Sequence, residues 1–442
     1  MAEILFDVEV LLGRQSLANL DLEALETALR RQALHLAGRA VEQRLNADHS
    51  DSLDSNLLCP CGQMARYAGR RAKMFTSVLG PLKLVRAYFH CAACGHGFCP
   101  RDRRMGVDHT ALSPGVTRMV GSVGAMVSFE EGSQLLTELA GLAVDAKQVE
   151  RTAEALGRAI AADEKQNMSA TDDQPLPSTL YLGLDGTGIP MRPSELKDRT
   201  GKQPDGSAKT REVKLCTVWS AEGRDENDTP VRDPGSVTYS AAIETAATLD
   251  TDKHRSPFTE RVLREATRRR FTQAQRTAVI GDGALWIWNI AQELFPNAIQ
   301  IVDRFHVKEH LGDLAKLLYP SNPSQATAWR TRRHEELDSG RLPGLLRAIR
   351  RHSGHSENAR KCFQYIHRNR DRMRYPQFHS QGFCTSSGVV EAGCKVAIGT
   401  RLKRSGMHWT VAGSNAIIAL RCSRLSGRFQ DFWERRLDRS AA

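Results

Sequence analysis

Short apolar runs bounded by turn residues recur through the middle of the chain and predict buried β-strands. Three of these runs, at residues 180–184, 211–221 and 236–243, follow one another with no helical pattern between them. Two more, at 277–280 and 298–302, flank a helical pattern at 284–294. A further helix is predicted to begin at Ser256-Pro257 and to continue to about residue 270. We therefore expect one mixed α/β sheet, with hairpin-linked strands followed by strand–helix–strand units.

Helical periodicity governs the regions on either side of these strands. Residues from about 21 to 45 form an amphipathic pattern, with leucines on one face and arginines elsewhere. Residues 113–165 are predicted to be helical from Ser113-Pro114, with a break at Gly141 and a cap at Asp145. That break fits a helix-turn-helix DNA-binding unit or an ordinary helical hairpin, and the pattern favours neither. Residues 304–380 predict long charged helices without a strand.

Two cysteine pairs flank a predicted hairpin around Gly80-Pro81 and suggest a zinc ribbon. Cys91 and Cys94 have the usual two-residue spacing, whereas only one residue separates Cys59 from Cys61, which strains a standard knuckle. A structural zinc site on these four thiols is the main hypothesis. Free thiols, or a site that uses His96 or Cys99, are the alternatives. The basic residues of the module, which suit contact with DNA, are Arg66, Arg70, Arg71 and Lys73.

These patterns divide the chain into a series of segments. The polar, proline-containing stretch at 166–178 is the clearest linker. The predicted segments are an N-terminal helical segment at 1–55, a zinc-ribbon-like module at 56–104, a helical domain at 105–165, the linker at 166–178, a catalytic core at 179–303 and 381–436, and a helical insertion at 304–380.

Three acidic residues carry the predicted chemistry: Asp185 in G-L-D-G-T, Asp282 in I-G-D-G-A and Glu391 in V-V-E-A-G. Each aspartate ends an apolar run, and an acid at the end of a buried strand is costly unless positive charge opposes it. The predicted order of strands and helices is that of a mixed sheet of the ribonuclease H kind. In such a sheet the first and fourth strands are neighbours at the centre, so the two aspartates are expected to be close. Two Mg²⁺ (or Mn²⁺) ions held by such acids suit phosphodiester cleavage. An Asp-Gly pair taken alone is more often a turn.

Glu391 and the motif D-R-F-H-V complete the predicted site. The apolar, small residues around Glu391 predict that it is largely buried, although a surface ion pair with Lys395 is the alternative. Asp303 and His306 follow a strand end and are expected either to lie beside the metal site or to form a helix cap with a partly buried histidine.

The basic charge of the chain is concentrated in its C-terminal third. The whole chain of 442 residues has a net charge of +11, but residues 301–442 hold 26 Lys and Arg against 12 Asp and Glu, a net +14. Such one-sided charge is typical of a protein that binds a polyanion, most often nucleic acid, or of a surface that keeps the protein soluble. Predicted DNA contacts gather around R-L-K-R-S-G-M-H-W-T: Lys395, Arg401, Lys403, Arg404, His408 and Trp409. Trp409 is the preferred residue for stacking on an unpaired base, whereas Trp286 and Trp288 are expected in the core.

No apolar run approaches the length of a membrane span, and the N-terminus lacks the basic start of a signal peptide. The expected location is the cytoplasm, at the nucleoid when bound to DNA. The cysteines are clustered rather than arranged as a disulfide scaffold, and isolated ones, among them Cys216 and Cys394, are expected in the core.

The motifs Y-L-G-L-D-G-T-G-I-P-M-R, V-I-G-D-G-A-L-W-I-W-N-I, I-V-D-R-F-H-V-K-E-H and S-G-V-V-E-A-G-C-K resemble bacterial insertion-sequence transposases of the Kra-type group, distant relatives of Mutator-type transposases. The resemblance covers residues 56–436. It implies a ribonuclease H-like core with a helical insertion before the last acid, a metal-binding triad of Asp185, Asp282 and Glu391, and accessory roles for Asp303 and His306.

The resulting hypothesis is a metal-dependent DNA transposase that cleaves element ends and transfers the 3′-hydroxyl to target DNA. The pairing of two ends predicts a homodimer or larger assembly. One alternative is a ribonuclease H-like nuclease without strand transfer, which would not require two specific inverted repeats. The other is a non-catalytic DNA-binding regulator, whose binding would survive loss of Asp185.

Overall fold

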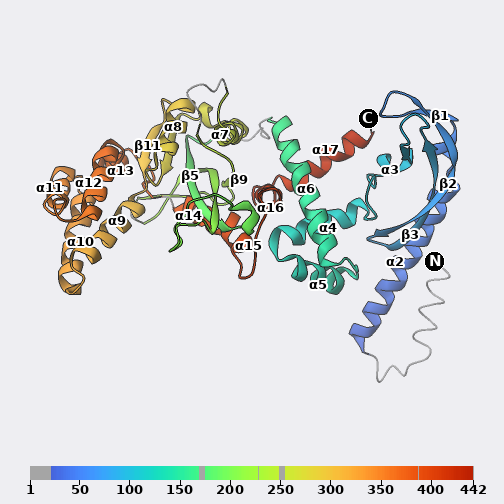
Figure 1. Ribbon diagram of the computed structural model, residues 1–442, viewed down its shortest axis with the longest axis horizontal. Helices are drawn as coiled ribbons and strands as arrows, with labels where there is room; N and C mark the ends of the chain where they lie inside the picture. The colour runs from blue at the N-terminus through green and yellow to red at the C-terminus, as the bar shows by residue number, and fades with distance from the viewer. Residues whose placement is uncertain (1–20, 169–174, 227, 248–253, 387, 442) are drawn as a thin grey trace. The chain divides into compact units, whose positions relative to one another are not determined.

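The computed structural model describes residues 21–168, 175–226, 228–247, 254–386 and 388–441, with side chains to residue 436 (Figure 1). Residues 1–20 of the predicted N-terminal segment and 169–174 of the predicted linker lie outside this description. The chain divides into two compact units, one formed by Met1–Leu156 with Gln430–Ala442 and the other by Gly157–Phe429. No helix in the described ranges is both long and apolar enough to cross a membrane.

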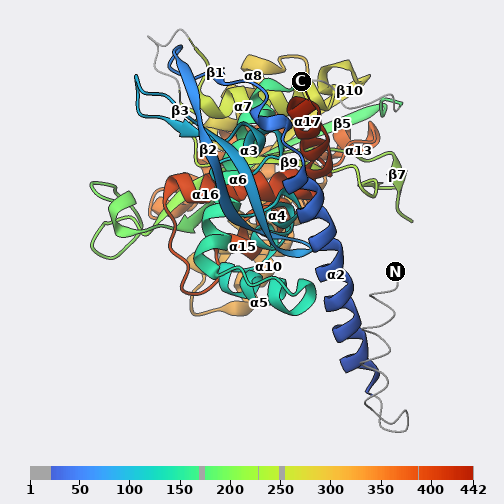
Figure 2. The same cartoon turned by 90° about the vertical axis from the view of Figure 1, so that its right-hand side faces the viewer.

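The first unit combines a four-stranded antiparallel sheet with helices. Its elements are α2 (Leu22–Ala47), β1 (Asn56–Leu58), β2 (Met64–Ser77), β3 (Gly80–His90), β4 (Gly97–Phe98), α3 (Pro100–Arg104), α4 (Pro114–Met126), α5 (Phe129–Ala140), the start of α6 (Ala146–Gln166) and most of α17 (Phe429–Ala441). The predicted hairpin is confirmed, since β2 and β3 pair from Ser77↔Gly80 onward. Figure 2 shows these strands as a long curved ribbon beside α2.

The predicted helix boundaries of this unit are confirmed by their caps. The Ser113 side chain accepts a hydrogen bond from the Val116 backbone at the start of α4. Gly141 ends α5 in the left-handed conformation, and the Asp145 carboxylate accepts from the Gln148 backbone N–H in the first turn of α6. The helix pair that the sequence allowed as a helix-turn-helix is therefore α5 and α6, joined by five residues.

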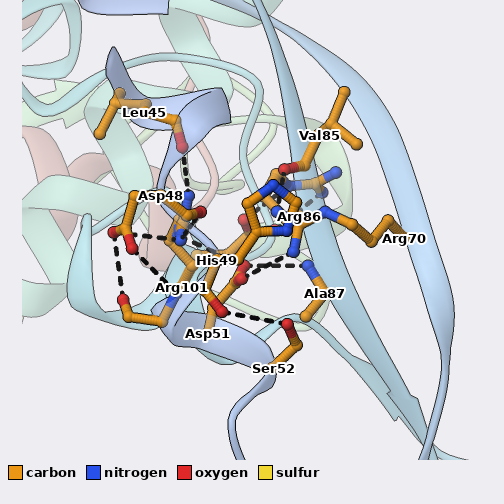
Figure 3. Close-up of polar contacts among 12 residues, drawn as sticks. Leu45, Asp48, His49, Asp51, Ser52, Arg70, Val85, Arg86, Ala87 and Arg101 are labelled. Atoms are coloured by element: carbon orange, nitrogen blue, oxygen red, sulfur yellow. Dashed lines mark hydrogen bonds and ion pairs between the residues drawn. The ribbon is translucent and has the colours of Figure 1, made fainter. Parts of the chain in front are cut away.

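A buried charge network anchors the end of α2 to the β2–β3 hairpin (Figure 3). The Asp51 carboxylate accepts from the Arg70 guanidinium at 2.9 Å and from the Ala87 backbone N–H at 2.9 Å. The Arg101 guanidinium lies 3.3 Å from the same carboxylate and also donates to the carbonyl oxygens of Leu45 and Asp48. Arg70 is thus a structural residue rather than the exposed DNA contact that the sequence suggested, because a buried charge must be paired.

The second unit is built on a five-stranded mixed sheet. Its strand order is β11-β10-β5-β6-β9, formed by β5 (Thr179–Pro190), β6 (Thr210–Ser220), β9 (Thr238–Ala242), β10 (Arg276–Gly281) and β11 (Ile299–Val302). Strands β5, β6 and β9 pair antiparallel, whereas β10 pairs in parallel with both β5 and β11. The prediction that the first and fourth strands of this sheet are neighbours at its centre is confirmed.

Strand β5 is longer than the sequence pattern predicted. It continues through Asp185 and Gly186 to Pro190, paired residue by residue with β6 as far as Thr210. Asp185-Gly186 is therefore not a turn. The two glycines in this stretch allow the close pairing, because a Cβ on Gly186 would lie 2.4 Å from the Glu212 carboxylate.

Helices pack on the sheet and bury its centre. Leu180, Leu182 and Leu184 of β5 are fully buried. Leu215 and Thr217, two residues apart on β6 and therefore on the same face of the sheet, lie against Gly393 at the end of α14. The helices around the sheet are α7 (Pro257–Arg268), α8 (Leu285–Leu294), α14 (Gly388–Gly393), a π-helical turn at Cys394–Gly399, α15 (Thr400–Leu402) and α16 (Val411–Leu425). A short hairpin of β7 (Gly223–Arg224) and β8 (Pro230–Val231) stands apart from the sheet.

Between β11 and α14 the described chain has helices joined by short loops and no strand, as the sequence predicted for residues 304–380. The elements are α9 (Arg304–Leu318), α10 (Pro323–Asp338), α11 (Leu342–Arg350), α12 (Glu357–Asn369) and α13 (Tyr375–Ser380). Figure 1 shows them gathered beside β11. Salt bridges from Arg304 and Lys308 to Asp338, at 2.6 and 2.7 Å, join α9 to α10.

Candidate active site

The two predicted aspartates follow residues that are partners in the sheet. Leu184 of β5 pairs with Gly281 of β10, and the next residues are Asp185 and Asp282. Because the two strands are parallel neighbours, both carboxylates emerge at the same edge of the sheet. The prediction that the two strands are neighbours is confirmed, but only Asp282 follows the end of its strand, because β5 continues past Asp185 to Pro190.

Asp185 is partly buried and held by two hydrogen bonds. One carboxylate oxygen accepts from the Gly186 backbone N–H at 2.6 Å, and the other accepts from the Cys394 thiol at 3.2 Å. Burial raises the pKa of Asp185 above its usual value, and the negative charge of Asp282 adds to this rise against the opposing hydrogen bonds. A carboxylate in this position is a charge that a cation would stabilise.

The Asp282 carboxylate stabilises the turn between its strand and the next helix, α8, whose N-cap residue is Ala284. The Asp282 side chain accepts from the Ala284 backbone N–H at 2.9 Å, and α8 begins at Leu285. Between them Gly283 has φ +97°, which a residue with a side chain rarely adopts. This tight turn leaves the carboxylate at the strand end.

Glu391 lies on α14, which packs on β5 and β6, but its side chain is exposed. The prediction that Glu391 is largely buried is therefore wrong. Its neighbour Val390 packs on β5, where a Cβ on Gly183 would lie 2.1 Å from the valine methyl group. In this helix the small and apolar residues meet the sheet, and the glutamate faces away from the core. Cys394, three residues later, contacts Asp185, so this end of α14 lies over the first aspartate.

Asp303 and His306 lie one strand further along the sheet. Asp303 is buried and caps α9, accepting from the Phe305 backbone N–H at 2.8 Å. His306 is half-buried, with Nε2 3.9 Å from the Asp303 carboxylate and Nδ1 3.1 Å from the Glu309 carboxylate. The Asp303 backbone N–H donates to the Gly281 carbonyl at 2.8 Å, which ties this motif to the end of β10. The helix-cap interpretation is confirmed, and the motif also lies next to the strand that presents Asp282.

The three acids do not converge as tightly as a formed metal cage. Within the described ranges, the one group of three or more His, Cys, Asp and Glu ligand atoms that all lie within 4.8 Å of one another is a set of four cysteines. Asp185 and Asp282 nonetheless supply what Mg²⁺ prefers, namely carboxylate oxygens with room for water and phosphate ligands. The raised pKa of Asp185 beside a second carboxylate fits a cation between them.

The predicted DNA contacts separate into exposed and buried residues. Lys395, Lys403 and His408 are exposed, and Arg404 is half-buried. Arg401 and Trp409 are buried, with the Arg401 guanidinium 5.2 Å from the Trp409 ring centre and the Trp409 indole N–H donating to the Leu402 carbonyl. Trp409 is therefore a packing residue in this structure rather than a stacking surface for a base.

Two residues at the site went unrecognised in the sequence. Cys394 was expected to be an ordinary core residue, yet its thiol contacts Asp185. Its spacing of three from Glu391 on a helix was the available signal. Tyr365, whose hydroxyl donates to the Asp282 backbone carbonyl at 2.7 Å, lies more than eighty residues from its partner and gave no local signal.

The four predicted zinc ligands come together in the first unit. The thiols of Cys59, Cys61, Cys91 and Cys94 all lie within 4.8 Å of one another, with Cys59–Cys94 and Cys61–Cys91 sulfur separations of 3.6 and 3.7 Å. Tetrahedral zinc with bonds of about 2.3 Å places its sulfurs about 3.8 Å apart. The set therefore fits zinc, despite the short first pair. His96 and Cys99 lie outside this set.

Each cysteine pair is shaped by a glycine with positive φ. The Gly62 N–H donates to the Cys59 carbonyl and the Gly95 N–H to the Cys91 carbonyl, both at 2.9 Å. Their φ values are +85° and +71°, and neither glycine has an atom within 4 Å of where a Cβ would be. Hydrogen bonds from the backbone of Cys94 and Ala93 lower the pKa of Cys91 to about 7, whereas burial and hydrogen bonds with the other thiols raise the pKa of Cys59 and Cys94.

Comparisons with known proteins add little to this description. No protein-family model and no curated protein matches the chain. One similar solved structure is the Drosophila P element transposase strand transfer complex, at 11% identity over 76% of this chain and 83% of that chain, with a TM-score of 0.26. At that TM-score the likeness establishes neither the fold nor the function of this chain.

Proposed function

We propose that this chain is a DNA transposase of the Asp-Asp-Glu type with a ribonuclease H-like core. It cuts DNA at the ends of an insertion sequence and joins the freed 3′-hydroxyl to target DNA. The observation that carries the proposal is the emergence of Asp185 and Asp282 from paired positions on the two central parallel strands. The helix that bears Glu391 packs on β5 and β6, and the π-helical turn that continues it contacts Asp185 through Cys394.

The reaction needs two displacements at phosphorus. In the first, water forms a new bond to the phosphorus at the element end, the bond to the 3′-oxygen breaks, and that oxygen leaves with a proton. In the second, the 3′-hydroxyl attacks a target phosphodiester and its proton passes to the oxygen that leaves. Two Mg²⁺ or Mn²⁺ ions, when bound, supply Lewis-acid stabilisation of the attacking and leaving oxygens.

The side chains of the site have separate roles in this proposal. Asp185, Asp282 and Glu391 would hold the metal ions, and the thiol of Cys394 orients the Asp185 carboxylate. Asp303 fixes the start of α9 and so orients His306, which positions a water molecule or a DNA phosphate at the edge of the site. Glu391 would supply its carboxylate from α14, whose π-helical continuation contacts Asp185.

The remaining segments bind DNA and assemble the complex. Lys395, Lys403, Arg404 and His408 provide phosphate contacts near the site. The zinc-ribbon-like module and the α5–α6 pair recognise the terminal inverted repeats. Pairing of the two element ends requires a homodimer or larger assembly, which acts in the cytoplasm at the nucleoid.

A strand-transfer assay tests this proposal. The substrate is a labelled duplex carrying the inverted repeat that flanks the coding region, incubated with a plasmid target and Mg²⁺. We expect joined products from the wild type and none from Asp282→Asn. Asp313→Asn, an exposed change on α9, serves as the matched control and is expected to behave as wild type.

Two other outcomes would contradict the proposal. Cleavage without joining would identify a nuclease. Specific binding with no cleavage or joining in either Mg²⁺ or Mn²⁺ would identify a DNA-binding regulator.

A further inference from the structure

Two tyrosines of the helical segment α9–α13 donate hydrogen bonds to the ends of two sheet strands. The Tyr365 hydroxyl, on α12, donates to the Asp282 backbone carbonyl at 2.7 Å. The Tyr375 hydroxyl, at the start of α13, donates to the Val302 backbone carbonyl at 3.1 Å. These carbonyls lie at the same edge of the sheet, because β10 and β11 pair in parallel up to Gly281↔Val302. Each tyrosine therefore contacts the chain at or beside an acid of the candidate site.

The Tyr365 ring also closes over the turn that follows Asp282. A Cβ built on Gly283 would lie 2.6 Å from the Tyr365 ring, so the two surfaces are in close contact. Asn369, fully buried one turn later on α12, places its amide nitrogen 3.5 Å from the Gly283 carbonyl. The turn is thus enclosed by one face of α12.

The second tyrosine is fixed in the core. Tyr375 is fully buried, and its hydroxyl donates to the strand end. Around Tyr365 the packing continues onto α9, since the His310 ring centre lies 4.7 Å from the tyrosine ring centre. Burial, together with the nearby charges of Asp282 and Asp303, raises the pKa of Tyr365, so its phenol stays neutral and keeps the proton that it donates.

We infer that the helical segment α9–α13 is a positioning device for the candidate active site, in which Tyr365 and Tyr375 hold the strand ends that carry Asp282 and Asp303. Neither hydroxyl touches a reacting atom, so both are positioning residues. The inference rests on the proposed function, because it assumes that Asp282 binds metal. It gives the segment a role within one chain, independent of any part in subunit pairing.

Removal of each hydroxyl alone tests this inference. Tyr365→Phe and Tyr375→Phe keep the rings and lose the donors. Tyr319→Phe is the matched control, because Tyr319 ends α9 in the same segment and its hydroxyl has no hydrogen bond to any described residue. Mn²⁺ binding to the DNA-free full chain is measured by electron paramagnetic resonance, and the Mg²⁺ dependence of strand transfer is measured separately.

We expect about tenfold weaker Mn²⁺ binding and an about tenfold higher half-saturating Mg²⁺ concentration for Tyr365→Phe, the usual scale for loss of a group that orients a metal ligand. Tyr375→Phe should show the smaller effect, because Asp303 lies beside the proposed metal ligands. Tyr319→Phe should match wild type. Thermal unfolding of each variant shows whether it is folded. A variant that is only partly folded would have lower activity, but its folded fraction would need the same Mg²⁺ concentration as wild type.

The outcomes separate this inference from the proposed function. Suppose that wild type binds Mn²⁺, Asp282→Asn does not, and Tyr365→Phe matches wild type in both Mn²⁺ binding and Mg²⁺ dependence. The positioning role of Tyr365 is then overturned, and the metal site at Asp282 is supported. If wild type and Asp282→Asn bind Mn²⁺ equally or not at all, the proposed function itself fails.

Discussion

At the scale of single residues, the candidate site shows a conflict between function and stability. Asp185 is a partly buried carboxylate beside Asp282, and burial, reinforced by that second charge, raises its pKa. A group of this kind destabilises the folded state when it is ionised. Such a cost is typical of residues whose charge serves chemistry rather than folding.

Asp185→Asn should therefore abolish DNA cleavage while it stabilises the metal-free protein. The pKa of Asp185 is raised only in the folded state. Ionisation of Asp185 therefore does not destabilise the protein at a pH below the usual aspartate pKa, and destabilises it fully at a pH above the raised pKa. We expect the free energy of unfolding to increase by about 1 kcal/mol at pH 8, with no gain in acid. Urea unfolding in the presence of a chelator at several pH values measures this, and a variant less stable than wild type at pH 8 would contradict it.

The second prediction at this scale concerns Gly283. Its substitution should lower stability in two separable ways, through the strain of a positive φ and through a clash with the Tyr365 ring. Gly283→Ala places a side chain at φ +97° and 2.6 Å from the Tyr365 ring, whereas Gly206→Ala has a similar φ of +77° with nothing within 4 Å. Gly206→Ala should cost about 1 kcal/mol of stability. Gly283→Ala should cost roughly 2 kcal/mol more because the turn must move away from α12. Equal losses in urea unfolding would show that α12 does not confine this turn.

The sequence correctly predicted that Asp185 and Asp282 lie on neighbouring strands, but it did not predict the degree of burial of Glu391 and Trp409. Asp185 and Asp282 each end an apolar run, and strand order alone brought them together. The exposure of Glu391 and the burial of Trp409 were not predictable, because both depend on which face of a segment meets the sheet. Small residues around Glu391 allow close packing of α14 on β5 without covering the glutamate itself.

At the scale of elements, the two cysteine knuckles make a prediction about metal content. We expect one zinc per chain, lost in Cys61→Ser but kept in Cys99→Ser, because the Cys99 thiol lies outside the four-sulfur cluster. Loss of zinc should lower the unfolding temperature of the module by about 5 °C or more, since the knuckles form a small core. Metal analysis of the purified variants and thermal unfolding with and without a chelator provide the measurement. Zinc retained in Cys61→Ser would show that another residue completes the site.

A buried ion pair makes the second element-scale prediction, with a pH dependence of the opposite sign to that of Asp185. Glu265 on α7 accepts from Arg428 at 3.0 Å and from Arg268 at 3.3 Å. Burial alone would raise the pKa of Glu265, but the two guanidinium groups outweigh it and hold the pKa below the usual 4.5. The stabilisation is therefore complete above about pH 4.5 and is lost as the pH falls through the lowered value.

Glu265→Gln should lower the free energy of unfolding by about 3 kcal/mol at pH 7, because it leaves buried arginines without their charge partner. The difference from wild type should shrink as the pH falls below 4.5 and become small below the lowered pKa, where the wild-type carboxyl is also neutral. Glu260→Gln, on the same helix with a more exposed salt bridge to Arg255, should change stability by less than about 0.5 kcal/mol. Unfolding in urea from pH 3 to 8 compares the three proteins, and a pH-independent deficit would exclude the ion pair as its cause.

Local signals predicted most element boundaries. The caps at Ser113, Asp145 and Ser256 each begin a helix as the sequence indicated. The extension of β5 beyond Asp185 was missed because it pairs with β6, from Gly186↔Lys214 to Pro190↔Thr210, which are separations of 28 to 20 residues, and its glycines locally favour a turn. Contacts between distant segments, such as Tyr365 with Asp282, were likewise invisible to local patterns.

At the scale of the whole molecule, charge distribution governs the expected binding to DNA. Residues 301–442 have a net charge of +14 in a chain whose total is +11. Lys395 and Lys403 are exposed near the candidate site, and the Lys403 ammonium already donates to Thr187 on the extended part of β5. Arg401, which the sequence grouped with them, is buried and should contribute structure rather than phosphate contacts.

The Lys395→Gln/Lys403→Gln double variant should therefore bind element-end DNA more weakly and with a shallower salt dependence. Each lost phosphate contact reduces the slope of log K against log salt by about 0.9, so the double variant should lose roughly 2. Lys316→Gln removes an exposed charge on α9 that is paired with Asp313, and its slope should stay within error of wild type. Fluorescence anisotropy with the labelled duplex between about 50 and 200 mM salt measures all three slopes. An unchanged slope in the double variant would place the DNA on another face, since the variant removes two charges beside Asp185 without altering the core beneath them.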